Sequence, residues 1–175
     1  MQITLFRHGI AQNCDDVLDD ADRQLTPKGI KRTKLSAIGL ANCCKDANLI
    51  LTSPKIRARQ TAEIAADVLQ LPIQIEQSLS QRNLAPIIGA IQQMDQKHII
   101  LVGHEPTFTE LAQYLCGQES LDTWAKGQEV FLTLKKAGAL SLEVDRRGAR
   151  LSPGARLLWL LPPSLLGSLG KPMID

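Results

Sequence analysis

Residues 3–9, Ile-Thr-Leu-Phe-Arg-His-Gly, place an arginine, a histidine and a glycine directly after a short apolar run. The run is β-branched and aromatic, which predicts a buried strand. Ligands of open α/β sheets bind outside the carboxyl ends of the strands, so Arg7, His8 and Gly9 stand where a ligand site is expected. The guanidinium offers forked donors for an oxyanion, and the imidazole can attack or carry a proton near neutral pH. The glycine lets the backbone approach a ligand closely.

Two later segments repeat this arrangement. A strand-like run at 98–102 ends in Gly103-His104, and another at 49–52 ends in Ser53-Pro54. Ser53 is expected to cap a helix that carries Arg57 near its start. Parallel strands would bring all three ends to one edge of the sheet. Two imidazoles and at least two guanidinium groups around one point suit chemistry on a phosphoryl group, which needs positioning and preplaced positive charge.

The remaining chain alternates strand and helix before it turns to strands alone. We expect helices at 27–44, 54–70, 87–94 and 107–116, and a late meander of strands at 128–134, 139–145 and 155–161. This order predicts an α/β fold, a three-layer α/β/α sandwich with a mostly parallel central sheet. The 175 residues are expected to form a single domain, 1–175, in which 166–175 is an apolar, irregular tail. The apolar face of the first helix is expected to comprise Ile30, Leu35, Ile38 and Leu40.

Composition narrows the class of protein. The chain is 44% hydrophobic and 22% charged, with a net charge of +2, which is ordinary for a globular protein and does not suggest nucleic-acid binding. The four cysteines show no metal-ligand or redox spacing, so we expect free thiols in a reducing cytoplasm. No signal peptide is evident, and the apolar stretch 157–169, broken by Pro162-Pro163, is too short to cross a membrane. We expect a monomer.

Metal and cofactor motifs are missing from the sequence. There is no HExxH, no Cys/His ligand spacing and no GxxxxGK[ST] or GxGxxG, so we expect neither a metal nor a cofactor. Two segments have two interpretations each. The Asp-rich loop 12–24 is either a solvated loop or a flap over the site, with Arg23 facing an anion. Residues 135–138, Lys-Lys-Ala-Gly, form either a turn between strands or a basic rim for an acidic partner.

Four motifs together resemble the histidine phosphatase superfamily, also called phosphoglycerate mutase-like. They are Arg7-His8-Gly9, Leu25-Thr26-x-x-Gly29, Ser53-Pro54-x-x-Arg57-Ala58-x-Gln60-Thr61-Ala62 and Gly103-His104. The resemblance spans residues 2 to about 161, and the short loops are similar to those of its short phosphohistidine phosphatase branch. It implies that His8 is the nucleophile and is transiently phosphorylated, with Arg7, Arg57 and His104 completing the phosphate pocket. Gly9 and Arg23 would contact the substrate.

One departure from the family pattern bears on the substrate. Many members carry an acidic proton donor after the second helix, but residues 79–86 contain none, and Asn83 stands about where a glutamate is often found. An alkoxide leaving group needs a general acid, whereas imidazole leaves readily once protonated. Glu76 or Glu105 could still supply the proton from another position.

The resemblance and this departure lead to one expected function. We expect a metal-independent phosphohistidine phosphatase in signal transduction, acting on a histidine-phosphotransfer domain or another phosphohistidine protein. The alternatives are a small-molecule phosphomonoesterase of the same superfamily and a non-catalytic phosphate-binding module.

Overall fold

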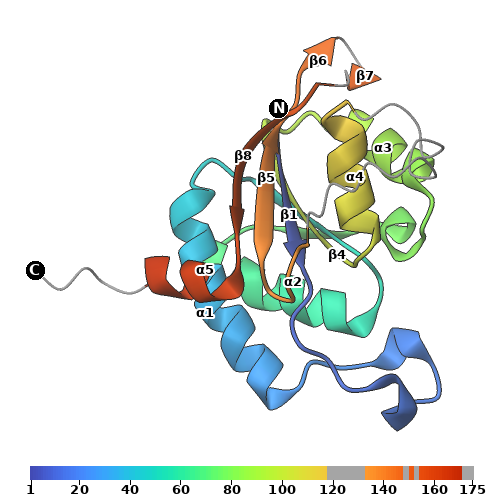
Figure 1. Ribbon diagram of the computed structural model, residues 1–175, viewed down its shortest axis with the longest axis vertical. Coiled ribbons are helices and arrows are strands. Elements are labelled where there is room, and N and C mark those ends of the chain that lie inside the picture. Colours follow the sequence, from blue (N-terminus) through green and yellow to red (C-terminus); the bar gives the residue numbers. More distant parts are fainter. Residues whose placement is uncertain (118–132, 148–149, 152–153, 171–175) are drawn as a thin grey trace, which may run out of the picture.

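The computed structural model describes residues 1–117, 133–147, 150–151 and 154–170. Helices and strands alternate through most of the described chain, as the sequence predicts (Figure 1). The strands are β1 (Gln2–Arg7), β2 (Leu49–Thr52), β3 (Ile73–Ile75), β4 (His98–Gly103), β5 (Ala139–Glu143), β6 (Arg146–Arg147), β7 (Arg150–Leu151) and β8 (Arg156–Leu161). The α-helices are α1 (Pro27–Cys43), α2 (Ile56–Leu69), α3 (Leu84–Gln92), α4 (Thr107–Leu115) and α5 (Pro163–Leu169); short 3-10 helices are η1 (Cys14–Asp16), η2 (Asp20–Asp22) and η3 (Gln77–Ser80).

A six-stranded sheet, in the order β3-β2-β4-β1-β5-β8, forms the centre of the fold. Strands β3, β2, β4 and β1 run parallel, whereas β5 pairs antiparallel with β1, and β8 pairs antiparallel with β5. The predicted mostly parallel sheet, followed by antiparallel strands, is therefore confirmed. Strands β2, β4 and β1 are neighbours, and β1 and β4 end in register at Arg7 and Gly103. The three ends that carry the predicted site lie side by side.

Helices cover both faces of the sheet and make the predicted three layers. Helices α1, α2 and α5 lie on one face, and α3 and α4 lie on the other (Figure 1). Successive residues of β4 point to opposite faces, as strand geometry requires: Ile99 and Leu101 join the core under α3 and α4, and Ile100 and Val102 join the core under α1 and α2. Both faces of the parallel strands are thus buried, which explains their nearly continuous apolar sequences.

Helix α1 packs through small residues, and this corrects the apolar face expected from the sequence. Leu40 is buried, but Ile30, Leu35 and Ile38 are 38%, 45% and 40% exposed. The buried positions of α1 are instead Gly29, Thr33, Ser36, Ala37, Gly39 and Leu40. Close backbone approach explains this choice. A Cβ on Gly29 would lie 2.0 Å from the Ile10 carbonyl oxygen, and one on Gly39 would lie 1.8 Å from the Leu166 oxygen.

Two expected helix boundaries also need correction. Helix α2 begins at Ile56 rather than at residue 54, and its N-cap is Lys55 rather than Ser53, whose hydroxyl is used elsewhere. Helix α3 begins at Leu84, earlier than expected, because the Asn83 side chain accepts a hydrogen bond from the Ala85 N–H and caps it. The asparagine that stands about where the family often has an acid is therefore a helix cap.

The C-terminal part of the chain differs in several places from the expected meander and tail. Residues 163–169 form helix α5, so the first part of the expected irregular tail, 166–169, is helical and packs against α1 through the buried Leu166. Residues 171–175 lie outside the described part of the chain. So does most of the strand expected at 128–134. Residues 146–147 and 150–151 pair as the short antiparallel strands β6 and β7. Among the described residues, no helix is long and apolar enough to span a bilayer.

The close contact between α1 and α5 makes a stability prediction. We expect Gly39→Ala to lower the free energy of unfolding by about 1–3 kcal/mol, because the new methyl group must push α5 away. Gly89→Ala is the matched control: a Cβ there meets no atom within 4 Å, so its helix propensity should make the protein about 0.5–1 kcal/mol more stable. Urea unfolding of both variants checks this, and equal effects of the two would contradict the packing argument.

Candidate active site

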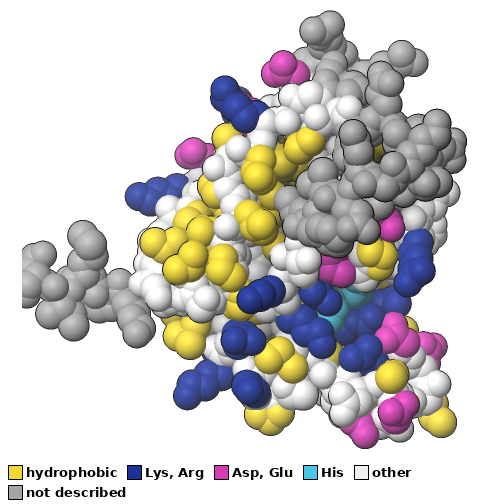
Figure 2. Space-filling view, in the orientation of Figure 1, with side chains coloured by type: hydrophobic (Ala, Val, Ile, Leu, Met, Phe, Trp, Pro, Cys, Tyr) yellow, Lys and Arg dark blue, Asp and Glu magenta, His cyan; other side chains and the backbone are white. Residues whose placement is uncertain are grey.

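A cavity of about 370 Å³ opens at the carboxyl ends of β1, β2 and β4. Basic side chains predominate in its lining, and in Figure 2 they surround the histidine surface. The cations are Arg7, Arg23, Lys55, Arg57, Arg82 and Lys136; the carboxylates are Asp20 and Glu105; the remaining lining residues are His8, Leu79, Ser80, Gln81, His104 and Thr107. The hollow can therefore hold an anion of several charges.

His8 is fixed as a neutral imidazole with one free nitrogen. Its Nδ1 lies 2.7 Å from the Gly9 carbonyl oxygen. A carbonyl only accepts, so Nδ1 carries the proton and donates, which leaves Nε2 unprotonated. Burial, and after it the neighbouring His104, lowers the pKa of His8 to about 2. At neutral pH, Nε2 is consequently available to attack an electrophile.

His104 faces His8 across the hollow. The two ring centroids are 5.0 Å apart and the rings are tilted by 54°. His104 Nε2 lies 2.9 Å from Ser53 Oγ, and its Nδ1 has no partner. Burial, and then Arg57, lowers the pKa of His104 to about 3. In the ligand-free protein His104 is therefore neutral, and it can donate to a bound oxyanion through only one of its nitrogens.

Arg7 and Arg57 reach the cavity from different elements. Arg7, the last residue of β1, donates from Nη1 to the Leu134 carbonyl at 2.6 Å, while its Nε has no partner. Arg57 is buried in the first turn of α2, and both of its terminal nitrogens donate to Asp20. The backbone groups of Arg7 and His8 are held by the turn at 137–138. The structure thus brings together all four residues predicted to form the phosphate pocket.

The acidic loop 12–24 lies beside the cavity, and Arg23 and Asp20 line it. Arg23 donates from Nε to the Gln12 carbonyl and from Nη1 to Asp20, so the loop presents it to the pocket as the flap interpretation requires. Gly9 also has a structural reason to be glycine. A Cβ there would lie 2.3 Å from Thr33 Oγ1.

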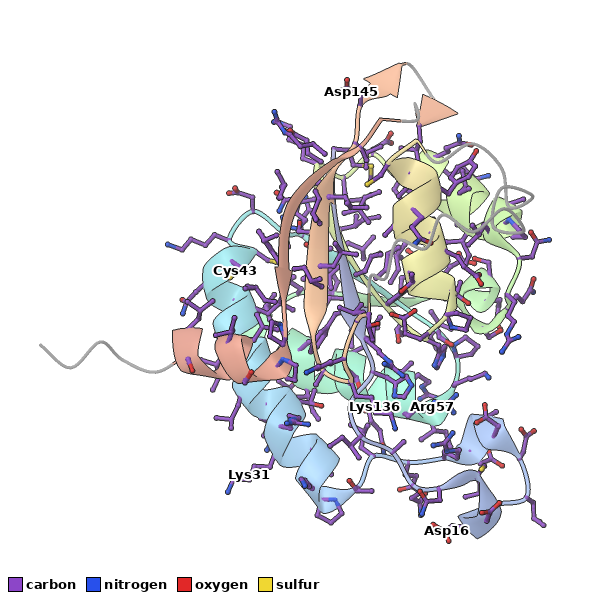
Figure 3. The ribbon with its side chains drawn as sticks, viewed as in Figure 1. Asp16, Lys31, Cys43, Arg57, Lys136 and Asp145 are labelled. Atoms are coloured by element: carbon purple, nitrogen blue, oxygen red, sulfur yellow. The ribbon has the colours of Figure 1, made fainter. Side chains whose placement is uncertain are left out.

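Sequence reasoning missed several residues of the site. Thr61 Oγ1 accepts from the Gly9 N–H at 3.0 Å and donates to the Arg57 carbonyl at 2.7 Å, so it ties the histidine loop to α2. Ser53 orients His104 instead of capping the helix. Lys136, in the turn after residue 134, lines the cavity beside Arg57 (Figure 3). The Gln-Thr-Ala motif was a signal for Thr61. Residues 135–138, for which a turn and a basic rim were both considered, form a turn, and Lys136 of that turn lines the cavity.

Of the two glutamates proposed as stand-in proton donors, Glu105 lines the cavity and Glu76 does not. Glu105 Oε2 accepts from the Thr109 N–H, and its Oε1 accepts from the Thr109 hydroxyl and the Leu134 N–H. Glu76 caps η3 by accepting from the Ser78 N–H, and it does not line the cavity. Each of these carboxylates is held as a hydrogen-bond acceptor by neighbouring N–H or O–H groups.

Known proteins match both the sequence and the fold. The family model of the histidine phosphatase superfamily, branch 1, matches residues 3–99. An uncharacterized protein of Picosynechococcus sp. is 40% identical over 172 residues, covering 95% of this chain and 99% of that protein. The phosphohistidine phosphatase SixA of Escherichia coli is 28% identical over 145 residues, covering 79% and 88% of the two chains. A solved structure of SixA complexed with tungstate matches with a TM-score of 0.75, at 24% identity, over 95% of this chain and 99% of that one. The resemblance read from the motifs is confirmed.

The buried histidines predict how stability depends on pH. The folded-state pKa values of His8, His104 and His98 are about 2, about 3 and about 4, all below the value of about 6.5 in an unfolded chain. A lowered histidine pKa contributes stability that is complete above pH 6.5 and is lost as the pH falls below it. We expect each histidine to cost roughly 2 kcal/mol at pH 5 relative to pH 7.5.

Urea unfolding at the two pH values measures this loss. His98→Gln, which keeps a nitrogen for the bond to Thr4 Oγ1, should remove about one third of the pH dependence. A free energy of unfolding that is equal at pH 7.5 and pH 5 would contradict the buried, neutral imidazoles.

Proposed function

Since the chain belongs to the histidine phosphatase superfamily and is a phosphatase with a histidine nucleophile, we propose that it removes phosphate from phosphohistidine on a protein, with His8 as that nucleophile. The observation that carries the proposal is the free Nε2 of His8. It belongs to a neutral imidazole that faces His104 inside a hollow lined by arginines and lysines.

The proposed reaction has two displacement steps. His8 Nε2 forms a bond to phosphorus as the bond from phosphorus to the substrate's imidazole nitrogen breaks, and the leaving nitrogen takes up a proton. Water then attacks the phosphorylated His8, the bond between phosphorus and Nε2 breaks, and inorganic phosphate leaves. Arg7, Arg57 and His104 bind the phosphoryl oxygens in both steps, and Arg23 contacts them from the flap.

The cationic lining makes a metal ion unnecessary for these steps. Phosphoryl transfer relies on positioning and on stabilising the charge spread over the phosphoryl oxygens. The arginines supply that charge from fixed positions, because Arg7 is bound to the Leu134 carbonyl and Arg57 to Asp20. We therefore propose metal-independent catalysis, with no cofactor.

The carboxylates that line the cavity support phosphohistidine over a phosphate ester. Glu105 is engaged by three donors, and its cavity neighbour Asp20 by Arg23, Lys55 and Arg57. The cations hold the pKa of Asp20 well below its usual range, so it does not donate a proton near neutral pH. An alkoxide would leave this site unassisted, whereas the imidazole of phosphohistidine is a better leaving group.

A histidine-phosphotransfer domain is the partner that we propose. The E. coli relative is named a phosphohistidine phosphatase, and the exposed Arg82 and the half-buried Lys136 leave positive charge at the mouth of the cavity for a protein surface. All four cysteines are free thiols, which suits the cytoplasm, the compartment that we propose.

Removing the nucleophile tests the covalent intermediate. We expect His8→Ala to abolish both phosphate release and the acid-labile phosphoenzyme trapped by rapid quench with a labelled substrate. Arg57→Ala should lower kcat/KM by about 10²- to 10³-fold, as the loss of one preorganised charge does elsewhere. Arg59→Ala, an exposed arginine two residues along α2, is the matched control and should keep full activity. A labelled phosphoenzyme in His8→Ala would overturn the assignment.

Substrate comparison separates the leading proposal from a small-molecule phosphomonoesterase. We expect kcat/KM on a phosphorylated histidine-phosphotransfer domain to exceed that on alkyl phosphate esters by at least 10²-fold, because the site lacks an acid for an alkoxide. Activity should be unchanged by a metal chelator. Faster turnover of alkyl esters would instead favour the phosphomonoesterase, and binding of the phosphorylated domain without phosphate release would favour a non-catalytic module.

A further inference from the structure

We propose that Asp20 is a positioning residue, which orients Arg57 for the phosphoryl group and anchors the loop that presents Arg23. Asp20 begins η2, in the middle of the acidic loop, and lies 37 residues from Arg57 in sequence. The proposal concerns the phosphate pocket itself, so it holds for any phosphoryl substrate of this enzyme.

Two different oxygens of Asp20 accept hydrogen bonds from the Arg57 guanidinium. Its carboxylate Oδ2 accepts from Arg57 Nη2 at 2.9 Å, and its backbone carbonyl accepts from Arg57 Nη1. Two bonds to one residue fix both the direction and the plane of the guanidinium, since the five N–H donors of arginine form a rigid fork. Arg57 has no other side-chain hydrogen bond among the described residues, and its Nε is buried without a partner.

The same carboxylate forms ion pairs with two more cations of the pocket. Oδ2 also accepts from Lys55 Nζ at 2.8 Å, and Oδ1 accepts from Arg23 Nη1 at 2.9 Å. Without this carboxylate, the positive charges of Arg23, Lys55 and Arg57 would repel one another at the mouth of the cavity. The cations keep the carboxylate ionised at neutral pH, because they lower its pKa.

Asp20 is also what attaches the middle of the loop to the body of the protein. Among the described residues, the other hydrogen bonds of residues 13–22 are local, such as those from Asp16 N–H to the Asn13 carbonyl and from Ala21 N–H to Asp19 Oδ1. The bonds of Asp20 instead reach Lys55 and Arg57, at the start of α2. Without the carboxylate, Asp20 keeps only its backbone bond to Arg57, loses its bonds to Lys55 Nζ and Arg57 Nη2, and no longer accepts from Arg23.

The position of the carboxylate argues against a different role, that of an internal anion that occupies the phosphate site. Among the described residues Asp20 has no hydrogen bond to Arg7, His8 or His104, the groups that surround the centre of the hollow. Its bonds lie with Arg23, Lys55 and Arg57 at one side. Asp20 thus holds the cations from the rim and leaves the centre open to the substrate.

Asp20→Asn tests the proposal, with Asp22→Asn as the matched control. Asp22 lies in the same 3-10 helix, and Asp22→Asn removes the same charge from the loop. Among the described residues, no hydrogen bond joins Asp22 to α2. We would measure tungstate binding by calorimetry and steady-state hydrolysis of an aryl phosphate. For Asp20→Asn we expect about ten-fold weaker tungstate binding, a raised KM and a kcat lowered by up to about 100-fold, because small misplacements of catalytic groups have effects of that size. Asp22→Asn should stay within two-fold of wild type in each measurement.

Asp20→Glu distinguishes an effect of the lost carboxylate charge from an effect of impaired folding. It restores a carboxylate, so it should recover more kcat than Asp20→Asn, and all variants should share the thermal unfolding midpoint of wild type within a few degrees. Equal behaviour of Asp20→Asn and Asp22→Asn would overturn the proposal. So would tighter tungstate binding by Asp20→Asn, which would make Asp20 a competitor of the substrate anion. Neither measurement uses phosphohistidine, so a wrong protein substrate would leave this test intact.

Discussion

The backbone pairing of β4 with its two neighbours is the constraint on which the site depends. His8 N–H donates to the Gly103 carbonyl at 3.0 Å, and Ser53 N–H donates to the Val102 carbonyl at 3.0 Å. These two bonds extend the parallel ladders by one residue beyond the regular strands. They bring the nucleophile, its facing histidine and the serine that orients that histidine to one edge of the sheet. A slip of either ladder by one residue would turn these side chains to the wrong face.

Charge and burial then decide what the grouped side chains can do. The two buried imidazoles beside several guanidinium groups are both held neutral, since burial and the nearby positive charge lower their pKa values. The gain is a nucleophile that needs no deprotonation. The site also concentrates positive charge, which Asp20 offsets through its ion pairs with Arg23, Lys55 and Arg57. Burial lowers the pKa of Arg7, and the negative charge of Glu105 opposes that shift.

The sequence predicted those parts of the site that rest on strand ends. Arg7, His8 and His104 follow apolar runs that are typical of buried strands. Parallel pairing of these strands brings the three side chains to the same edge of the sheet. Arg57 followed from its place near the start of a helix. Contacts between distant segments were not predictable in the same way. Ser53 precedes a proline and a helix, a pattern that favours a helix cap, yet its hydroxyl serves His104. Nothing local in a loop with five aspartates, Asp15, Asp16, Asp19, Asp20 and Asp22, marks Asp20 as the one that reaches α2. Likewise, exposed Ile30, Leu35 and Ile38 mislead because α1 approaches its neighbours through glycines.

The protonation state of His8 tests the account most directly, because the neutral imidazole with a free Nε2 follows from the fold, the burial and the charge together. Nitrogen-15 NMR of the histidine-labelled, ligand-free protein between pH 5 and pH 8 measures it. The account predicts a His8 ring that keeps its proton on Nδ1 and an unprotonated Nε2 throughout this range. A His8 that titrates near pH 6.5, or one that carries its proton on Nε2, would contradict it.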